Sequence, residues 1–260
     1  TGEELWRALE MTSETGYSSP IVIDAGGARQ LIFWHATALV SLNPETGETY
    51  WEQDFLNTGG LSIGTPVHSG RYLLISQFRT GSMMMTLNND RPAAQMLWKG
   101  QSRSELPYLT DGLHAMMSTP IIIDDYLYGV DSYGELRGID ATTGERLWQS
   151  DALTPPGRFG TAYFVRNGDR YFINTDTGDL VIAILRQDRR GAAATGGVLA
   201  FGRKGAITPT GLAQSRYVDM MTNCPLSFGV GPAGTGKTFL AAAYGASLLR
   251  AKSVSRLGVT

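Results

Sequence analysis

The chain has 260 residues, of which 42% are hydrophobic and 18% are charged, so its composition excludes wholesale disorder and predicts a folded core. A single cysteine excludes an internal disulfide framework and a zinc site built from several thiolates. No run of residues approaches the ~18 apolar positions that a membrane span needs, so we expect no membrane span.

Charge divides the chain into two parts. Residues 1–185 contain 12 Lys and Arg against 22 Asp and Glu, whereas residues 186–260 contain 10 Lys and Arg against 2 Asp and Glu. All five tryptophans lie in the first part. Net charges of −10 and +8 in one chain predict two modules, of which the basic one would favour anionic partners.

A tryptophan repeat organises the first module. The sequence Thr-Gly-Glu-x-x-Trp ends at Trp6, Trp51 and Trp148, and a weaker copy without Thr-Gly ends at Trp98. The four tryptophans are spaced by 45, 47 and 50 residues. Because the residue is large and recurs once per period, we predict that it packs between neighbouring units of the repeat rather than binding a ligand.

A second landmark keeps the same period. A pair of small residues followed by a β-prone run begins at Ser18, Gly64 and Ser118, with a degenerate copy at Gly160. Between the landmarks lie short β-branched and aromatic runs joined by turns rich in Gly, Asp and Asn, and the carboxylates of these turns are expected to be solvated. About four short strands in ~40–50 residues indicate the blade of a β-propeller.

The repeat is incomplete at both ends. The chain opens on the last strand of one blade, and the copy that begins at Gly160 runs to residue 183 without its Thr-Gly…Trp strand. Propellers close with ~4–8 blades, so closure here would be minimal or absent and would leave exposed edges.

These repeats resemble those of the quinoprotein-like β-propellers, over roughly residues 1–183. The resemblance implies either a quinone-dependent dehydrogenase or a non-catalytic scaffold, a class that includes outer-membrane assembly factors. Dehydrogenases that carry a vicinal cystine need two adjacent cysteines, whereas the single cysteine, Cys224, lies outside the repeats. We therefore favour a scaffold that binds a protein or a small ligand.

Residues 186–203 follow the repeats and are first basic, then small and glycine-rich. This composition predicts a linker, and the alternative is a basic patch for RNA.

The motif Gly-x-x-x-x-Gly-Lys-Thr occupies residues 231–238, between a β-prone run at 226–230 and a helix-prone run at 239–250. This is the strand–loop–helix context of a P-loop, and the alternative is a glycine-rich turn with a chance Lys-Thr. Amides of such a loop and the helix N-terminus surround phosphates, Lys237 would reach the β- and γ-phosphates, and the Thr238 hydroxyl would ligate Mg²⁺. The predicted residues for ATP and Mg²⁺ are Gly231, Ala233, Gly234, Thr235, Gly236, Lys237 and Thr238.

The residues around this motif resemble the start of the PhoH-like ATPase domain, over residues 204–260. The matching runs are 214–218, 226–241 and 254–260, with Phe239 where Tyr is usual and Gly258 interrupting the last run. The resemblance implies a cytoplasmic ATP-binding protein linked to RNA metabolism, with RNA as a further partner.

The resemblance also places Gln214 where such proteins often carry an adenine-reading glutamine. The alternative is a surface glutamine on a helix whose inward face is formed by Ala213, Tyr217, Met220 and Met221.

The sequence supplies neither a metal-holding Walker B acid nor a catalytic base after the motif, and a doubly wound sheet needs more than the two strands expected here. We therefore expect that hydrolysis is not self-sufficient in this chain, and we assign no catalytic residue.

The expected fold is mainly β: a partial propeller of three to four four-stranded blades (1–185), a linker (186–203) and a truncated α/β P-loop segment (204–260). Three hypotheses follow: a nucleotide-binding protein, a propeller scaffold, and a fusion of two unrelated fragments. The two resemblances conflict on the compartment, which we leave open. We interpret the chain as having arisen by fusion of two fragments. ATP binding is the biochemical activity that its sequence indicates best.

Overall fold

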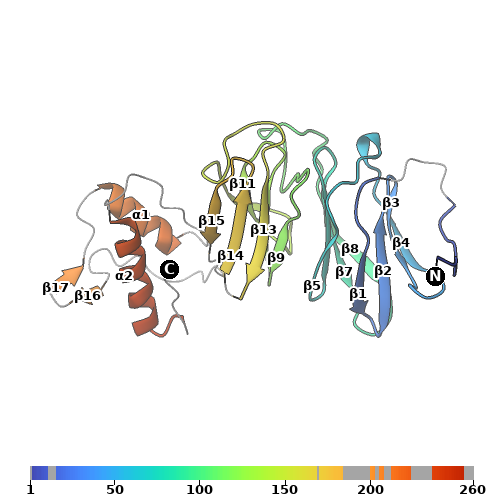
Figure 1. The fold of residues 1–260 in the computed structure, drawn as a ribbon, viewed down its shortest axis with the longest axis horizontal. Coiled ribbons are helices and arrows are strands. Elements are labelled where there is room, and N and C mark those ends of the chain that lie inside the picture. Colours follow the sequence, from blue (N-terminus) through green and yellow to red (C-terminus); the bar gives the residue numbers. More distant parts are fainter. Residues whose placement is uncertain are drawn as a thin grey trace. The chain divides into compact units, whose positions relative to one another are not determined.

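The computed structural model describes residues 2–10, 16–168, 170–183, 200–202, 205–207, 212–223 and 236–254. The chain forms two compact units, Thr1–Ile182 and Ala183–Thr260 (Figure 1). We call them the propeller unit and the C-terminal unit and describe each by itself.

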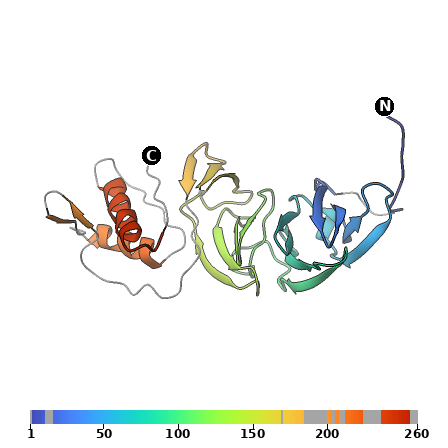
Figure 2. The same cartoon turned by 90° about the horizontal axis from the view of Figure 1, so that it is seen from below.

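Four antiparallel sheets make up the propeller unit (Figures 1 and 2). Sheet A contains β1 (Ile21–Ala25), β2 (Ala28–Trp34), β3 (Ala38–Leu42) and β4 (Thr49–Asp54). Sheet B contains β5 (Val67–Ser69), β6 (Tyr72–Gln77), β7 (Gly81–Leu87) and β8 (Ala94–Lys99). Sheet C contains β9 (Ile121–Ile123), β10 (Tyr126–Val130), β11 (Leu136–Asp140) and β12 (Arg146–Ser150). Sheet D contains β13 (Ala162–Asn167), β14 (Arg170–Thr175) and β15 (Leu180–Ala183).

Within each sheet the strands are neighbours in chain order, as expected for propeller blades. The prediction of a mainly β partial propeller is therefore confirmed. A short 3₁₀ helix, η1 (Thr58–Gly60), interrupts the connection from sheet A to sheet B.

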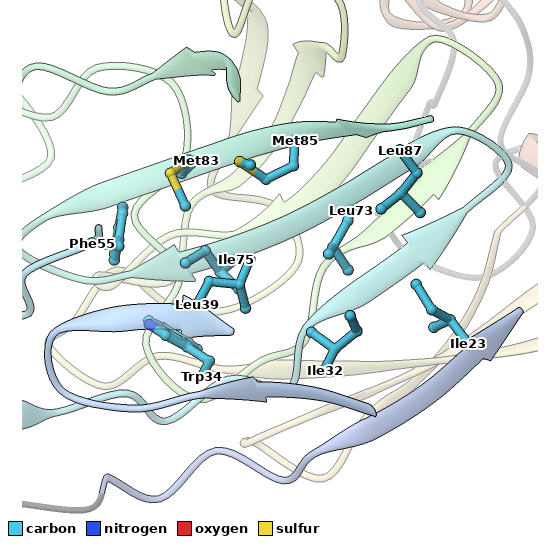
Figure 3. Packing of buried hydrophobic residues seen from close by; sticks show 10 residues of the cluster. All are labelled: Ile23, Ile32, Trp34, Leu39, Phe55, Leu73, Ile75, Met83, Met85 and Leu87. Atoms are coloured by element: carbon cyan, nitrogen blue, oxygen red, sulfur yellow. The ribbon is translucent and has the colours of Figure 1, made fainter. Parts of the chain in front are cut away.

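The cores between the sheets form from side chains that alternate along each strand. Figure 3 shows Ile32 and Trp34 of sheet A pointing toward Ile75, Met83 and Met85 of sheet B, and all five are at most 1% exposed. Because successive side chains of a strand point to opposite faces, Met84, which lies between Met83 and Met85, packs toward sheet C.

Sheet B is covered on both faces, which explains its continuous apolar runs. Leu73 and Ile75 belong to the core shared with sheet A, whereas Tyr72 and Leu74 pack with sheet C. Every residue of β6 is buried as a result. A strand buried on both faces loses the alternation of apolar and polar residues that marks a half-exposed strand.

The Thr-Gly-Glu turns have the predicted geometry. Gly47 and Gly144 adopt φ values of 77° and 79°, in the left-handed region that favours glycine. The side chain of the residue that opens each turn accepts a hydrogen bond from a backbone amide. The Glu45 amide donates to Oδ1 of Asn43, and the Thr142 amide donates to Oδ1 of Asp140, both at 2.8 Å. These side-chain acceptors stabilise the turns locally.

Residues 2–10 were expected to form the last strand of a blade, but they belong to no sheet among the described residues. They contact sheet A instead, where Ala8 and Leu9 pack against a cluster that includes Val40.

The C-terminal unit contains a hairpin of β16 (Ala200–Gly202) and β17 (Gly205–Ile207) and two helices, α1 (Leu212–Asn223) and α2 (Lys237–Arg250). Helix α2 confirms the helix predicted over 239–250 and begins two residues earlier. Strand β16 lies inside the segment predicted as a linker, so that prediction is wrong at residues 200–202. The strands expected at 226–230 and 254–260 lie outside the described residues, except Val254. No helix in the described ranges is long and apolar enough to cross a bilayer.

Candidate nucleotide-binding site

Three of the seven predicted nucleotide-binding residues lie together at the start of α2. Gly236 precedes the helix, and Lys237 and Thr238 form its first two positions. Gly231, Ala233, Gly234 and Thr235 lie outside the described residues. The structure therefore defines the helix end of the predicted loop.

Gly236 has a conformation that only glycine adopts easily. Its φ of 82° and ψ of 12° are left-handed, and its carbonyl accepts the first hydrogen bond of the helix from the Leu240 amide at 2.9 Å. A Cβ on Gly236 would lie 3.4 Å from Nε2 of Gln214. The glycine thus turns the chain into α2 while α1 lies close beside it.

The N-terminus of α2 carries positive potential. Among the described residues no side chain caps the helix at Gly236, and no acidic residue lies in its first turn. The first N–H groups of a helix have no partner within the helix, and the helix dipole adds about half a positive charge at this end. Lys237 is half-buried, the Thr238 side chain is exposed, and Arg250 lies at the opposite end. This arrangement can bind an anion.

Helix α1 is held against α2 by a small apolar core. Leu240 and Ala243 of α2 are buried, and Tyr217 and Val218 of α1 pack against them. Burial raises the pKa of Tyr217. Met220, expected on the inward face, is 41% exposed and is not part of this core, so that prediction is wrong.

The same packing decides where Gln214 lies. It is one turn ahead of Tyr217 and Val218 on α1 and is half-buried beside Gly236. The sequence left open whether this glutamine is near the motif or is a surface residue, and the structure brings it to the motif. Its role toward an adenine base stays a prediction.

In the propeller unit, Trp98 joins neighbouring blades as predicted, and Trp6 joins the N-terminal segment to sheet A in the same way. The Trp98 indole of sheet B lies on Gly144 of sheet C, where a Cβ would come within 2.8 Å of the ring, and its Nε1–H donates to the Ala141 carbonyl at 2.8 Å. Trp6 lies on Gly47 of sheet A in the same way and donates to the Pro44 carbonyl at 3.1 Å. Each indole covers the Thr-Gly-Glu turn of the following sheet, which explains why that turn recurs with the tryptophan.

The other two repeat tryptophans differ. Trp51 packs against the core that sheets A and B share, which confirms inter-blade packing for it, whereas the inter-blade packing of Trp148 stays a prediction. The Trp51 Nε1–H donates to Oε1 of the buried Gln30 at 2.9 Å. The turn that Trp51 would meet in sheet B, at residues 88–93, has no Thr-Gly. Trp148 lies against Gly138 of its own sheet C, and the corresponding turn after β15 lies outside the described residues.

The comparison with protein families accounts for the repeats. The sequence model of the outer membrane protein assembly factor BamB matches residues 1–204, which is more than half of the chain. The chain belongs to this family. A second family model, that of the PhoH-like proteins, matches residues 206–260, so the chain joins a BamB-like segment to a PhoH-like segment.

Curated relatives of both kinds match. The BamB of Kangiella koreensis is 26% identical over 172 residues, which is 60% of this chain and 40% of that protein. PhoH-like proteins of Mycobacterium leprae and of Mycobacterium tuberculosis H37Rv are 46% and 48% identical over 54 residues, which is 21% of this chain. The chain spans only 16% and 15% of those two relatives.

Among solved structures, BamB from Moraxella catarrhalis aligns with a TM-score of 0.41 and 14% identity, covering 67% of this chain and 50% of that one. The computationally designed Ika4 protein aligns with a TM-score of 0.46 and 11% identity, covering 70% of this chain and 98% of that one.

The BamB-like segment contains a buried ionic cluster that the sequence did not reveal. Asp131 follows β10 in a turn, where a solvated carboxylate was expected, but it is 1% exposed and lies 3.0 Å from the guanidinium of the fully buried Arg137. Arg137 also pairs with Glu135 at 2.7 Å. Burial raises the pKa of Asp131 to about 6, against the opposing effect of Arg137.

This cluster secures the long connection between sheets B and C. Arg137 donates to Oγ1 of Thr110 at 2.8 Å and to the carbonyl of Gly112 at 3.1 Å, and Asp131 accepts from the His114 amide at 2.8 Å. The His114 ring contacts Asp111 at 2.9 Å, and this contact holds the pKa of Asp111 well below its usual range. Because the connection covers the charges, we interpret the cluster as structural.

A cavity of about 240 Å³ lies at the contact between sheets B and C of the BamB-like segment. Its lining includes Trp98, Lys99, Asp111 and Glu145. Ligand pockets usually measure ~300–1,000 Å³, so the space is small for an organic ligand. In the described part of the chain, no group of three His, Cys, Asp or Glu side chains could hold a metal ion.

Proposed function

We propose that the C-terminal unit binds Mg·ATP through residues 231–238. The observation that carries this proposal is the uncapped N-terminus of α2, which begins with Lys237 and Thr238 after a left-handed Gly236. Binding a triphosphate requires amide donors and a cationic side chain close together. The first amides of α2 and the Lys237 ammonium would supply both. The likeness to PhoH-like proteins covers the same residues and supports the proposal.

The roles of the side chains follow from their chemistry. The Lys237 ammonium would pair with the β- and γ-phosphates, and the Thr238 hydroxyl would complete the coordination of a Mg²⁺ that arrives with the nucleotide. Glycines at 231, 234 and 236 would let the backbone approach the phosphates without a Cβ between them.

The proposal is for nucleotide binding. Phosphoryl transfer to water needs an acid that holds the metal and a residue that positions the water, and the two carboxylates of residues 186–260, Asp188 and Asp219, are assigned neither role.

Calorimetric titration with Mg·ATP tests the proposal. We expect Lys237→Ala to weaken binding by ~10-fold or more, because a charge-assisted hydrogen bond is worth about 1.5–3 kcal/mol. Lys252→Ala is the matched control, since Lys252 is an exposed lysine beyond the other end of α2, and its affinity should equal that of the wild type. Equal affinities for all three proteins would contradict the proposal.

A second candidate function concerns the propeller unit, which we propose is a non-catalytic scaffold that binds unfolded outer-membrane proteins. Four exposed apolar side chains lie on the connections between successive sheets: Leu56 (71% exposed), Tyr108 (79%), Leu109 (55%) and Phe159 (48%). Backbone hydrogen bonds tie these connections to the turns between the second and third strands of the sheets. The Asn57 amide donates to the Ala36 carbonyl, and the Gly157 amide donates to the Tyr133 carbonyl. The connections therefore lie at the same end of their sheets. Exposed apolar side chains gathered at one end favour a protein partner.

Fluorescence anisotropy with a labelled, urea-unfolded outer-membrane barrel protein tests the scaffold proposal. We expect a Tyr108→Ser, Leu109→Ser variant to bind ~100-fold more weakly or worse, because each buried apolar side chain is worth about 1.5–3 kcal/mol. Leu97→Ser, on an exposed position of β8, is the control. Unchanged binding of the double variant would contradict this second function.

A further inference from the structure

Contacts between cations and aromatic rings recur at one end of the sheets in the propeller unit. In each contact, the charged group of a lysine or arginine lies within about 6 Å of a ring centre, where the π electrons attract it. The three pairs are Lys99 over Phe55 at 4.7 Å, Arg79 over Phe78 at 5.5 Å and Arg158 over Phe159 at 4.8 Å. These contacts restrain the cations near the surface.

Backbone hydrogen bonds place the three pairs at the end of the sheets that carries the connections, which we call the connection end. The Phe55 amide donates to the Thr37 carbonyl in the turn between β2 and β3, at 2.8 Å. The Phe159 amide donates to the Ser132 carbonyl in the turn between β10 and β11, at 3.0 Å. Arg79 lies in the corresponding turn of sheet B, between β6 and β7. The cations therefore share the connection end with the exposed apolar side chains of the second candidate function.

A fourth cation, Arg103, belongs to the same group. Its side chain is exposed, and its guanidinium donates to the carbonyl of Thr80, the residue after Arg79, at 3.1 Å. The pKa of Lys99 is lowered by burial and by the charge of Arg103, against the opposing effect of Asp54. The two positive charges are therefore close to each other. We call Lys99, Arg79, Arg103 and Arg158 the cationic patch.

The carboxylates around the cationic patch do not balance its charge. Glu105 pairs with Arg158 at 2.9 Å and lies 3.8 Å from Arg79. The acids of the neighbouring buried cluster are already paired with Arg137. In the part of the chain that the structure describes, the printed ionic contacts of the patch involve two carboxylates, Glu105 and Asp54. Four cations against two carboxylates leave the patch with positive charge to share with a partner.

The exposed edges of the guanidinium groups suit carboxylates. The side chains of Arg79 and Arg158 are 43% and 44% exposed. A guanidinium that is held over a ring keeps N–H groups at its edge, and two of these can bind one carboxylate. Leu56 and Tyr108, at the same end of the sheets, are 71% and 79% exposed and can contact apolar side chains next to such carboxylates.

The charge of the whole unit indicates which kind of anionic partner fits. Residues 1–185 carry a net charge of −10. A nucleic acid or an anionic membrane extends far beyond the Debye length of ~8 Å and would meet the repulsion of the entire unit. A short acidic segment of an unfolded protein interacts mainly with the charges next to it. The cationic patch therefore favours carboxylates of a protein segment over phosphates of a nucleic acid or a lipid surface.

We propose that the cationic patch binds extended protein segments that carry carboxylates next to aromatic or aliphatic residues. The carboxylates pair with Arg79, Arg103 and Arg158, while the apolar side chains contact Leu56 and Tyr108. This proposal rests on the proposed scaffold function and states which segments of an unfolded outer-membrane protein the propeller unit binds.

Fluorescence anisotropy with two matched peptides tests the charge preference. One short labelled peptide repeats Asp-Asp-Tyr-Tyr, and the other repeats Asn-Asn-Tyr-Tyr. We expect the wild type to bind the aspartate peptide ~10-fold more tightly at low salt, because several exposed charge pairs act together, and we expect the difference to shrink as salt is added. Equal affinities for the two peptides at low salt would overturn the proposal.

Arginine variants locate the preference. A triple variant, Arg79→Gln with Arg103→Gln and Arg158→Gln, should bind the aspartate peptide ~10-fold more weakly and the asparagine peptide as the wild type does. The matched control is Arg91→Gln, because Arg91 is exposed in the turn between β7 and β8 at the opposite end of sheet B. Its affinity should equal that of the wild type. Should the triple variant fail to fold, Arg103→Gln alone should still weaken binding by ~2-fold or more.

Two further measurements separate this proposal from its alternatives. Binding of phosphatidylglycerol vesicles, with no binding of the aspartate peptide, would assign the patch to a membrane and overturn the proposal. The urea-unfolded barrel protein is then measured in the same assay. If the wild type and the triple variant bind it equally, the role of the patch is contradicted and the scaffold function stands. If the wild type binds the aspartate peptide but not the barrel protein, the patch is supported and the scaffold function is contradicted.

Discussion

Arg137 lies fully buried between two carboxylates, at 3.0 Å from Asp131 and 2.7 Å from Glu135. Removing one partner of a buried pair leaves the other charge uncompensated, which costs ~3–5 kcal/mol. We therefore expect Arg137→Met to lower the free energy of unfolding of the propeller unit by that amount, measured by urea denaturation. Arg158→Met is the control, because Arg158 pairs with Glu105 at 2.9 Å but is 44% exposed, and its loss should cost less than about 1 kcal/mol.

The same cluster makes stability depend on pH. The pKa of Asp131 is raised from 3.8 to about 6 by burial, so the folded state binds this proton more tightly than the unfolded chain does. The stabilising contribution of the protonated carboxyl is complete below pH 3.8 and is lost as the pH rises through about 6. We expect the free energy of unfolding of the wild type, relative to Asp131→Asn, to increase as the pH falls through this window. A difference that does not change with pH would contradict this assignment.

For individual residues, the sequence predicted which residues form the P-loop motif but not which side chains pack around them. Gly236, Lys237 and Thr238 could be placed because a spaced pattern defines them, whereas Gln214 could be placed only once the packing of α1 on α2 was known. Nothing in the sequence near Asp131 signals burial. The residues that cover it come from the connection between sheets B and C, which has no periodic pattern of its own.

At the scale of the elements, the contact between an indole and a glycine turn determines how blades join. Gly144 has a φ of 79°, and a Cβ there would come within 2.8 Å of the Trp98 ring, whereas Gly70 has a φ of 56° with no atom within 4 Å of its Cβ position. We expect Gly70→Ala to cost ~1–2 kcal/mol from the left-handed backbone alone. Gly144→Ala should cost clearly more, because the indole must also move. Equal costs, measured by urea denaturation, would show that Trp98 adapts freely.

The strands were predictable because apolar runs and turns repeat with the tryptophans. The spacing of such a repeat indicates which strands belong to the same sheet. The limit of this reasoning is visible at Trp51. It has the expected sequence before it and packs toward sheet B, but its indole N–H donates to Gln30 of its own sheet, and the turn of sheet B at residues 88–93 has no Thr-Gly. The short strand β16 was missed because the glycine-rich composition around it resembles that of a linker.

For the whole molecule, the asymmetry of charge predicted two modules, and the chain forms two compact units that match two different families. This is consistent with the interpretation of the chain as a fusion of two fragments. The described cores of the units differ in size. Among the described residues, the core between sheets A and B alone contains ten buried residues, whereas the cluster that joins α1 to α2 contains two. Since stability scales with buried apolar area, the C-terminal unit should be the less stable one.

The distribution of probes along the chain allows the two units to be followed separately during unfolding. All five tryptophans lie in the propeller unit, whereas both α-helices of the described residues lie in the C-terminal unit. In urea we expect helical circular dichroism to be lost before tryptophan fluorescence changes, because transitions of separate units need not coincide. Coincident transitions would show that the units unfold together.

Mg·ATP should then affect only one of these transitions. A ligand at a hundred times its Kd stabilises the unit that binds it by ~2.7 kcal/mol, so the helical transition should move to higher urea while the fluorescence transition stays in place. At the same Mg·ATP concentration the stabilisation in the Lys237→Ala variant should fall to ~1.4 kcal/mol or less, so its helical transition should move by at most about half as far, and in the Lys252→Ala variant it should move as in the wild type. A shift of the fluorescence transition instead would place the nucleotide in the propeller unit and would contradict the proposed site.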